Sequence, residues 1–278
     1  MLEEKAIDFC GISEHWLFEK DLNFLNMIDS NYRSHSVSDS SLRYPNNRRV
    51  GKGGVAIMWH KDYDSYVTPL EIYDDRIVGI QIELSELCFI YMFQVYLPCS
   101  NHSIQSYKRY LEKMDNILST YSDMGMIILL GDFNANILSK KFSKPHDYRS
   151  RYLMNFVNQN SLVAINTLEM CCGARSSFVS YDGSNESLID HIMLPIEKLD
   201  LVGKVCIFED NSLNVSSHRP VYCSINVPFG DLHQPSVSSH INWNRVDSES
   251  IDLYQSTLQG DASLIHLCKD DYTFSSMF

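Results

Sequence analysis

The chain of 278 residues carries a formal net charge of -12 at pH 7, and 44% of its residues are apolar. That apolar content is enough for a sizeable core, and the length suits one domain plus a tail, because α/β and sandwich enzymes of ~200–250 residues often form a single domain. The acidic balance excludes a general nucleic-acid coat protein, since nonspecific binding depends on clustered Lys and Arg that neutralise phosphates. A local basic strip remains compatible with DNA binding.

The N-terminal segment has no basic start followed by an apolar stretch, so it is not a secretory signal. No apolar run approaches the ~20 residues that a membrane span needs. The eight cysteines lie at irregular spacings without a CxxC pair, which is typical of free thiols in a reducing compartment. We therefore expect an intracellular protein, nuclear or cytoplasmic, that is neither secreted nor inserted in a membrane, and no obligate protein partner is evident.

Short β-like segments rich in Val, Ile, Phe and Tyr recur along the chain. In order they are AIDFCGIS, GGVAIMW, RIVGIQIEL, LCFIYMFQVYL, MIILLGDF, LIDHIML, KVCIFE and RPVYCSINV. Two helical patterns lie among them, from about Ser103 to Tyr121 and from about Tyr148 to Asn160, where apolar residues return at three- and four-residue spacing. Many strands with few helices predict two packed sheets flanked by helices.

The composition changes near the end of the last β-like segment. From Pro228 the chain reads PFGDLHQPSVSSHINWNRVDSES, which is polar, rich in turn residues and without strand alternation. We therefore expect a core domain over residues 1–227 and a polar linker and tail over residues 228–278.

Polar side chains stand at the ends of several apolar strands. The run MIILLGDFNAN stops at a Gly turn and then presents Asp132 and Asn134 on the same side of the chain. CGISEHWL ends a strand with Glu14, and NVSSHRPV places His218 just before another strand. Asp190 lies inside the apolar run SLIDHIML, where an isolated buried carboxylate is costly without a partner. Taken singly, each also fits a structural role as a turn former, a surface group or a packed histidine.

These four runs, in this order, resemble the endonuclease/exonuclease/phosphatase superfamily over about residues 2–227. GDFNAN is the most specific of them, because the family pattern is Gly-Asp-x-Asn, while SEHWL, SLIDHI and SSHRPV match its other strand ends. VYLPCSN resembles the family's Tyr-x-Pro strand end. HDYRSRYLMNFVNQNSLVAIN, followed by SSFVSYDGSNESLIDHI, is similar to the apurinic/apyrimidinic-like endonucleases of non-LTR retrotransposons, and the tail INWNRVDSESIDLYQ resembles the segment after them.

The resemblance implies a DNase-I-like, four-layer α/β/β/α sandwich with two packed mixed sheets. It also implies a phosphodiesterase that uses Mg²⁺, with Mn²⁺ as the alternative ion, and nicks DNA as in retrotransposon target cleavage. In that case Glu14 ligates the metal, Asp132 activates the attacking water, and Asn134 orients this water or holds the phosphate.

The remaining roles implied by the resemblance concern the phosphate itself. Tyr96 contacts the phosphate or the leaving group, although a strand-end tyrosine also commonly serves packing. Asp190 accepts a hydrogen bond from His218, which keeps the imidazole charged or correctly oriented to stabilise the pentavalent phosphate.

Two strips of basic residues stand out in the sequence, and the second is a candidate for contact with DNA phosphates. The first contains Arg48, Arg49 and Lys52; the second follows GDFNAN and contains Lys140, Lys141, Lys144, Arg149 and Arg151. The position of the second strip favours phosphate binding beside the site, although a solvated loop is an equal alternative.

Three departures from the family pattern bear on activity. Ser217 stands where the family has Asp before the catalytic His, which predicts a weaker site or altered metal use. The family's first strand, with an Asn that supports the metal site, should precede LEEKAIDFC, and a reverse transcriptase normally follows; the sequence shows neither, so we expect a truncated copy with unpaired strand edges. The alternatives are therefore an inactive retrotransposon remnant, or a relative that acts on RNA or a small phosphoester.

Overall fold

The computed structural model describes residues 7–39, 50–137, 147–210 and 214–228. At its centre lies a six-stranded sheet in the order β4-β5-β6-β7-β12-β8. Its strands are β4 (Val67–Leu70), β5 (Ile77–Ser85), β6 (Cys88–Tyr96), β7 (Met126–Asp132), β12 (Asp190–Pro195) and β8 (Leu162–Ala164). Only the β6–β7 pair in this sheet is parallel, so the sheet is mixed.

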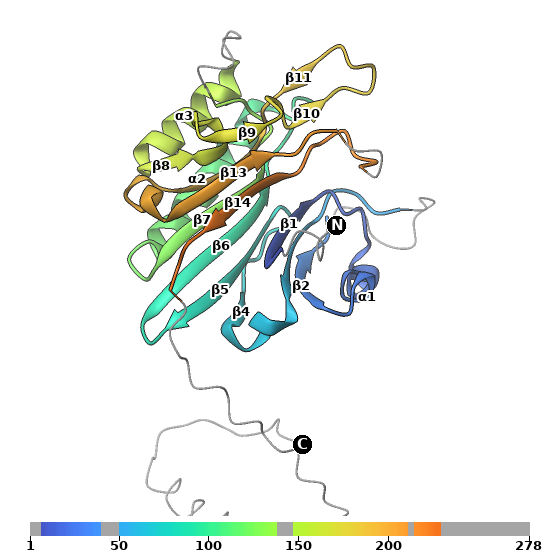
Figure 1. Cartoon of the computed structure of the whole chain (residues 1–278). Helices are drawn as coiled ribbons and strands as arrows, with labels where there is room; N and C mark the ends of the chain where they lie inside the picture. Colours follow the sequence, from blue (N-terminus) through green and yellow to red (C-terminus); the bar gives the residue numbers. More distant parts are fainter. Residues whose placement is uncertain (1–6, 40–49, 138–146, 211–213, 229–278) are drawn as a thin grey trace, which may run out of the picture. The chain divides into compact units, whose positions relative to one another are not determined.

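Two helices cover one face of this sheet, α2 (Ile104–Tyr121) and α3 (Tyr148–Gln159) (Figure 1). Each begins where a side chain caps it: Ser103 accepts the N–H of Ser106, and Asp147 accepts the N–H of Ser150. Both helices match their predicted extents closely, because their apolar faces repeat at helical spacing. The larger part of the buried core lies between these helices and the sheet.

Two three-stranded sheets pack on the opposite face of the central sheet and together form the second layer of the sandwich. One has the order β1-β3-β2, with β1 (Phe9–Ser13), β2 (Tyr32–Val37) and β3 (Val55–His60). The other has the order β14-β13-β9, with β9 (Cys171–Gly173), β13 (Val202–Ile207) and β14 (Val221–Ile225). The short strands β10 (Phe178–Val179) and β11 (Glu186–Ser187) form a hairpin. The short helix α1 (Leu25–Ile28) contacts β2, and 3-10 turns span Glu19–Phe24, Lys61–Tyr66, Ile165–Thr167 and Ile196–Leu201.

The predicted DNase-I-like α/β sandwich is confirmed, and all eight predicted strand segments form strands. Among the described residues, the helical elements beside the β1-β3-β2 sheet are α1 and the 3-10 turns Glu19–Phe24 and Lys61–Tyr66, all of them short, so this layer is thinner than the family pattern implies. The strands that the sequence analysis missed are polar, as in β2, contain a proline, as in β4, or have only two or three residues.

Each sheet of the second layer has an open edge at β1 or β14, in addition to its other edge strand, β2 or β9. In the described part of the chain, β1 pairs with β3 alone and β14 pairs with β13 alone. β1 packs over β6 and β7, whereas β14 packs over β12. Gln94, which is 1% exposed, donates to Ser13 Oγ at 2.8 Å, while its Oε1 atom has no partner among the described residues. Unpaired strand edges and an orphaned buried carbonyl both cost free energy.

The described residues contain no helix that is both long and apolar enough to cross a membrane. The domain boundary expected at Pro228 falls at the last described residue, and the tail over residues 229–278 lies outside the described part of the chain.

Candidate active site

Three polar side chains lie in a row across three neighbouring strands of the central sheet. Tyr96 at the end of β6 pairs with Asp132 at the end of β7, and Asp132 pairs with Asp190 at the start of β12. Directly paired residues project from the same face of a sheet. The row faces the second layer, because Tyr96 packs among the core residues between the two layers. Strand register thus brings together residues that are far apart in the sequence.

Gly131 sets the position of Asp132. Its φ is 138°, and a Cβ there would lie 2.0 Å from the carbonyl oxygen of Val95 on β6. Only glycine fits this conformation and this close approach without strain. β7 can therefore stay against β6 to its last residue, where it presents the Asp132 carboxylate, which is 5% exposed.

Asn134 holds the Asp132 carboxylate at both oxygens. Its backbone N–H donates to Oδ1 at 2.8 Å, and its side-chain Nδ2 donates to Oδ2 at 3.0 Å and to the Leu97 carbonyl at 2.9 Å. Asn134 adopts φ 48°, a left-handed conformation that asparagine tolerates better than most residues. The Asn of GDFNAN therefore acts first as a clamp on the neighbouring Asp.

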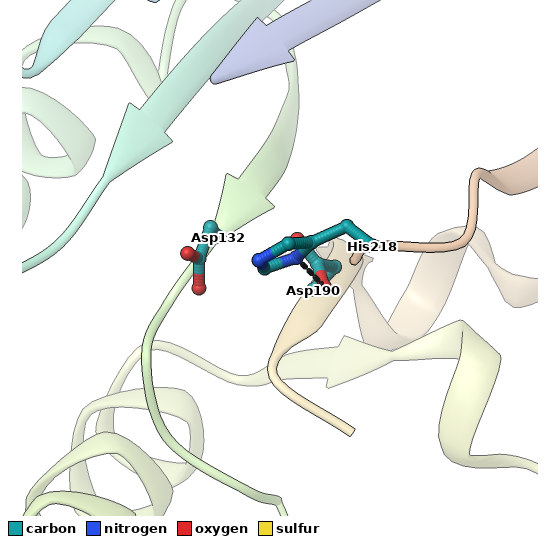
Figure 2. Close-up of side chains that lie close together, drawn as sticks. All are labelled: Asp132, Asp190 and His218. Carbon is teal, nitrogen blue, oxygen red and sulfur yellow. Dashed lines mark hydrogen bonds and ion pairs between the residues drawn. The ribbon is translucent and has the colours of Figure 1, made fainter. Parts of the chain in front are cut away.

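His218 closes over the row from the segment before β14 (Figure 2). Its Nδ1 lies 2.8 Å from Asp190 Oδ2, and the phenyl ring of Phe178 packs edge-on against the imidazole at 5.0 Å between centroids. Because Nδ1 donates to Asp190, Nε2 is the nitrogen free to face the substrate. Asp132, Asp190 and His218 each offer an atom within 4.8 Å of the others.

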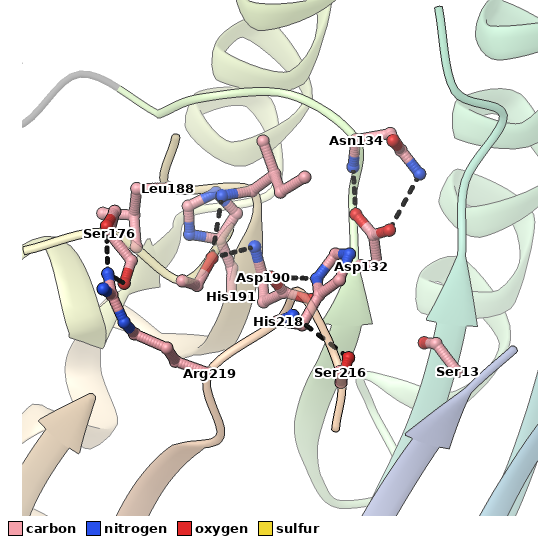
Figure 3. Close-up of polar contacts among 12 residues, drawn as sticks. Ser13, Asp132, Asn134, Ser176, Leu188, Asp190, His191, Ser216, His218 and Arg219 are labelled. Atoms are coloured by element: carbon pink, nitrogen blue, oxygen red, sulfur yellow. Dashed lines mark hydrogen bonds and ion pairs between the residues drawn. The ribbon is translucent and has the colours of Figure 1, made fainter. Parts of the chain in front are cut away.

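Polar contacts beneath the row fix Asp190 (Figure 3). Ser177, which is fully buried, accepts the backbone N–H groups of Ile189 and Asp190 at 3.1 Å and 3.0 Å. Asn166 donates to the Asp190 carbonyl at 2.9 Å. On the far side of β12, His191 is buried and its Nε2 contacts the Ala135 carbonyl at 3.1 Å, so it is a structural histidine.

The two central groups have perturbed pKa values. Burial, together with the nearby Asp190 and Glu14 carboxylates, raises the pKa of Asp132 well above its ordinary value, although His218 and the Asn134 N–H oppose this. Burial alone would lower the pKa of His218, but its hydrogen bond to Asp190 and the charges of Asp190, Asp132 and Glu14 raise it. A carboxyl group and an imidazole whose pKa values are both raised thus face one another, an arrangement typical of sites that carry out acid–base chemistry.

Glu14 reaches the row from the other layer. It follows β1 with φ 58°, is exposed, and accepts a hydrogen bond from the Tyr96 hydroxyl. Burial and this contact raise the pKa of Tyr96, so the hydroxyl remains a donor. His15 supports the segment: its Nδ1 accepts the Leu17 N–H at 3.0 Å, and its Nε2 contacts the Val37 carbonyl at 3.0 Å.

The donor set suits a hard divalent cation. Asp132 and Asp190 bring two carboxylates close together, and Glu14 adds a third that raises the Asp132 pKa. Clustered carboxylates of this kind are the oxygen ligands that Mg²⁺ and Mn²⁺ prefer. The ligand atoms of Asp132, Asp190 and His218 lie closest together. Glu14 lies outside this group and is hydrogen-bonded to Tyr96, the neighbour of Asp132 in the row.

The structure also places the residues with weaker sequence evidence. Ser217 is exposed, and its carbonyl accepts the Val179 N–H at 2.9 Å. Arg149 lies on α3 and donates to the His102 carbonyl at 2.6 Å. Three of the four predicted substrate-binding residues, Lys140, Lys141 and Lys144, lie outside the described residues.

The sequence analysis missed the residues that support the site. Ser177, Phe178 and Asn166 carry no motif of their own, although the first two lie within the segment SSFVSYDGSNESLIDHI that carries the family resemblance. Arg219, which follows His218, donates from Nε and Nη2 to the two carboxylate oxygens of Asp210 at 2.8 Å and 2.6 Å. This ion pair anchors the segment that carries His218, and the adjacent arginine was the signal available in the sequence.

Comparison with known proteins agrees with these motifs. Residues 90–222 match the family described as endonuclease-reverse transcriptase. Craniofacial development protein 2 of Bos taurus is 23% identical over 201 residues, which cover 69% of this chain and 32% of that protein. The chain therefore spans about a third of the length of the curated relatives it matches.

Solved structures share the fold at low identity. The AP endonuclease LMAP from Leishmania major gives a TM-score of 0.67 at 12% identity and covers 82% of this chain and 80% of its own. The endonuclease domain of TRAS1, a telomere-specific non-LTR retrotransposon, gives 0.57 at 18% identity and covers 81% and 89%. The chain thus has the DNase-I-like fold of the endonuclease/exonuclease/phosphatase superfamily, and over residues 90–222 it matches the endonuclease-reverse transcriptase family.

Proposed function

We propose that this chain is a divalent-metal-dependent phosphodiester hydrolase that nicks DNA, as in retrotransposon target cleavage. The observation that carries the proposal is the His218–Asp190 pair facing Asp132, with a third carboxylate, Glu14, held beside them by Tyr96. The domain responsible is residues 1–227, with residues 228–278 as a linker and tail.

Each side chain of the site has a separate role in the in-line attack of water on the phosphodiester. Asp132 has a raised pKa and is the base that takes the proton of the attacking water, while Asn134 keeps its carboxylate in place. His218, held protonated by Asp190, places a charged N–H at the phosphoryl oxygens and stabilises the charge of the pentavalent transition state. Tyr96 directs its hydroxyl toward the same space.

Glu14 and the Asp132–Asp190 pair would hold the cation, Mg²⁺ or Mn²⁺, which polarises a phosphoryl oxygen when it is bound.

A second candidate is a catalytically inactive remnant that folds but does not cleave. The observation that favours it is Ser217, which is exposed at a position where the resemblance leads us to expect a carboxylate. The loss of one carboxylate next to His218 would lower the affinity for the cation. A superfamily member specific for RNA or a small phosphoester is a further outcome of the experiment below.

The test is nicking of supercoiled plasmid in Mg²⁺ or Mn²⁺ by the wild type, Asp132→Asn and His218→Gln. Removal of a general base or of a transition-state donor costs ~10²–10⁴-fold in rate, so we expect both variants to lose nicking. Asp200→Asn changes an exposed carboxylate in the 3-10 turn that follows β12, at the opposite end of this strand from Asp190; it is the matched control and should nick normally.

Metal binding is measured separately by the rise in melting temperature on addition of Mg²⁺, since a ligand that binds only the folded state stabilises it. A folded protein that gains no stability from either ion and leaves plasmid, RNA and simple diesters intact would establish the inactive remnant in place of the nuclease. Cleavage of RNA alone would replace DNA as the substrate.

A further inference from the structure

Arg76 is a cation that lies largely buried beside Tyr96. It precedes β5, is 8% exposed, and donates from Nη1 to the Tyr96 carbonyl at 3.2 Å. Its guanidinium carbon lies 4.8 Å from the centroid of the Tyr96 ring. Among the described residues no carboxylate lies within ion-pair distance of this guanidinium. A charge in this setting is costly unless an anion compensates it.

The nearest acidic residues are engaged elsewhere. Asp74 pairs with Lys113 and accepts only the backbone N–H of Arg76, and Asp75 accepts the hydroxyl of Tyr110. Within the described residues, the fully buried polar side-chain atoms without a partner belong to Gln94, Arg149 and His191. The unpaired Nε and Nη2 of Arg76 are not among them, so these donors reach the surface.

Two further cations lie near Arg76, one from each of the two basic strips of the sequence. Arg149 of α3 donates to the His102 carbonyl at 2.6 Å, and its Nε is buried without a partner in the described part of the chain. Lys52, which pairs with Asp39 at 3.3 Å, precedes Gly53, where a Cβ would lie 3.8 Å from the Tyr96 ring. Burial, then the charges of Arg76, Lys52 and Arg149, lower the pKa of His102, because all three cations lie around it.

We propose that Arg76, Arg149 and Lys52 form a second phosphate subsite, which binds a phosphodiester group next to the scissile one in the substrate strand. Tyr96 lies between the catalytic site and this second subsite. Its hydroxyl contacts Glu14 in the catalytic site, and its ring packs against the Arg76 guanidinium in the subsite. The two arginines supply planar donor groups that match phosphate oxygens. The inference rests on the proposed function and sharpens it, because a substrate that fills both places is a polynucleotide and not a lone phosphoester.

The test combines a change in the substrate with a change in the protein. A short DNA duplex with one cleavage site is compared with duplexes that carry a neutral methylphosphonate at one phosphate flanking that site, on either side. For the wild type, loss of the charge on the flanking phosphate should lower kcat/KM about tenfold or more, since a charge-assisted contact is worth ~1.5–3 kcal/mol. In Arg149→Gln, kcat/KM on the unmodified duplex should already be reduced, and the methylphosphonate should add little.

Arg33→Gln is the matched control, because Arg33 is an exposed arginine on β2 that belongs to neither basic strip and pairs with Asp64 at 3.9 Å. It should respond to the methylphosphonate as the wild type does. Arg76→Gln, if it folds, should behave like Arg149→Gln. Equal sensitivity to the methylphosphonate in wild type and Arg149→Gln, or no sensitivity in the wild type, would overturn the subsite.

Failure of the proposed function is recognised independently with bis(p-nitrophenyl) phosphate, a diester with a single phosphate. If the wild type hydrolyses neither this compound nor DNA, catalysis is absent, and the subsite is tested by fluorescence anisotropy with a labelled oligonucleotide in chelator. Arg149→Gln should then bind several-fold more weakly than Arg33→Gln, with a salt slope smaller by about one. Equal affinities would reject the subsite even for a protein that only binds.

Discussion

The charge state of His218 depends on its burial and on the carboxylates around it, of which Asp190 is the hydrogen-bonded one. Burial disfavours the imidazolium, whereas the hydrogen bond to Asp190 and the charges of Asp190, Asp132 and Glu14 favour it. The raised pKa means that His218 stays protonated to higher pH than an ordinary histidine. Its contribution to folding stability is therefore fully present below the pKa of the unfolded chain and is lost as the pH rises through the higher folded-state pKa.

We predict that Asp190→Asn lowers the His218 pKa, because the opposing effect of burial then dominates. The alkaline limb of the kcat/KM profile should move to lower pH, and NMR titration of the imidazole should show the same shift. The Asp200→Asn control should keep the wild-type profile. If the alkaline limb stays in place while activity falls, Asp190 positions the ring without setting its charge.

Among the elements, β7 shows how one strand end determines the site. Gly131 allows β7 to remain against β6 up to Asp132, and the same registers align Tyr96 and Asp190 with that residue. A disturbance of this strand end should therefore affect both stability and catalysis.

We predict that Gly131→Ala destabilises the protein by ~2–5 kcal/mol, from the strained φ together with the clash against Val95. Gly183→Ala is the matched control, because Gly183 has φ 69° but nothing within 4 Å of its added Cβ. It should cost only ~1 kcal/mol. Denaturant unfolding measures both, and equal losses would show that the contact with β6 contributes nothing.

At the scale of the whole molecule, the two layers differ in completeness. The central sheet continues through six strands, whereas the second layer consists of two three-stranded sheets with open edges at β1 and β14. All residues of β1 and β14 are partly exposed, in contrast to the mostly buried β6.

We predict that the backbone amides of β1 and β14 exchange hydrogen faster than those of β6 and β7, since unpaired edges open more easily. Hydrogen exchange followed by mass spectrometry, with peptides that cover each strand, tests this. Protection in β1 and β14 equal to that in β6 would mean that an additional extended segment pairs with both edges.

The sequence by itself determined the elements whose pattern is local. The helix over Ile104–Tyr121 and the apolar strands were predicted because each buries a face that its own spacing of apolar residues defines. The candidates Glu14, Asp132, Asn134, Asp190 and His218 were also found, because each interrupts or ends an apolar run within a recognisable motif. β2, with the polar sequence YRSHSV, was missed because its pairing with β3, and not its composition, makes it a strand.

Only the tertiary structure decided which of these residues meet. The alignment of Tyr96, Asp132 and Asp190 follows from the registers of β6, β7 and β12, and no local pattern encodes the register between distant strands. The convergence of Lys52 and Arg149 on Arg76 was equally invisible, since the two basic strips lie far apart in the sequence. In the sequence, Arg76 is a single arginine before a strand. Its proposed role in phosphate binding follows from its burial against Tyr96 without a carboxylate partner in the described residues.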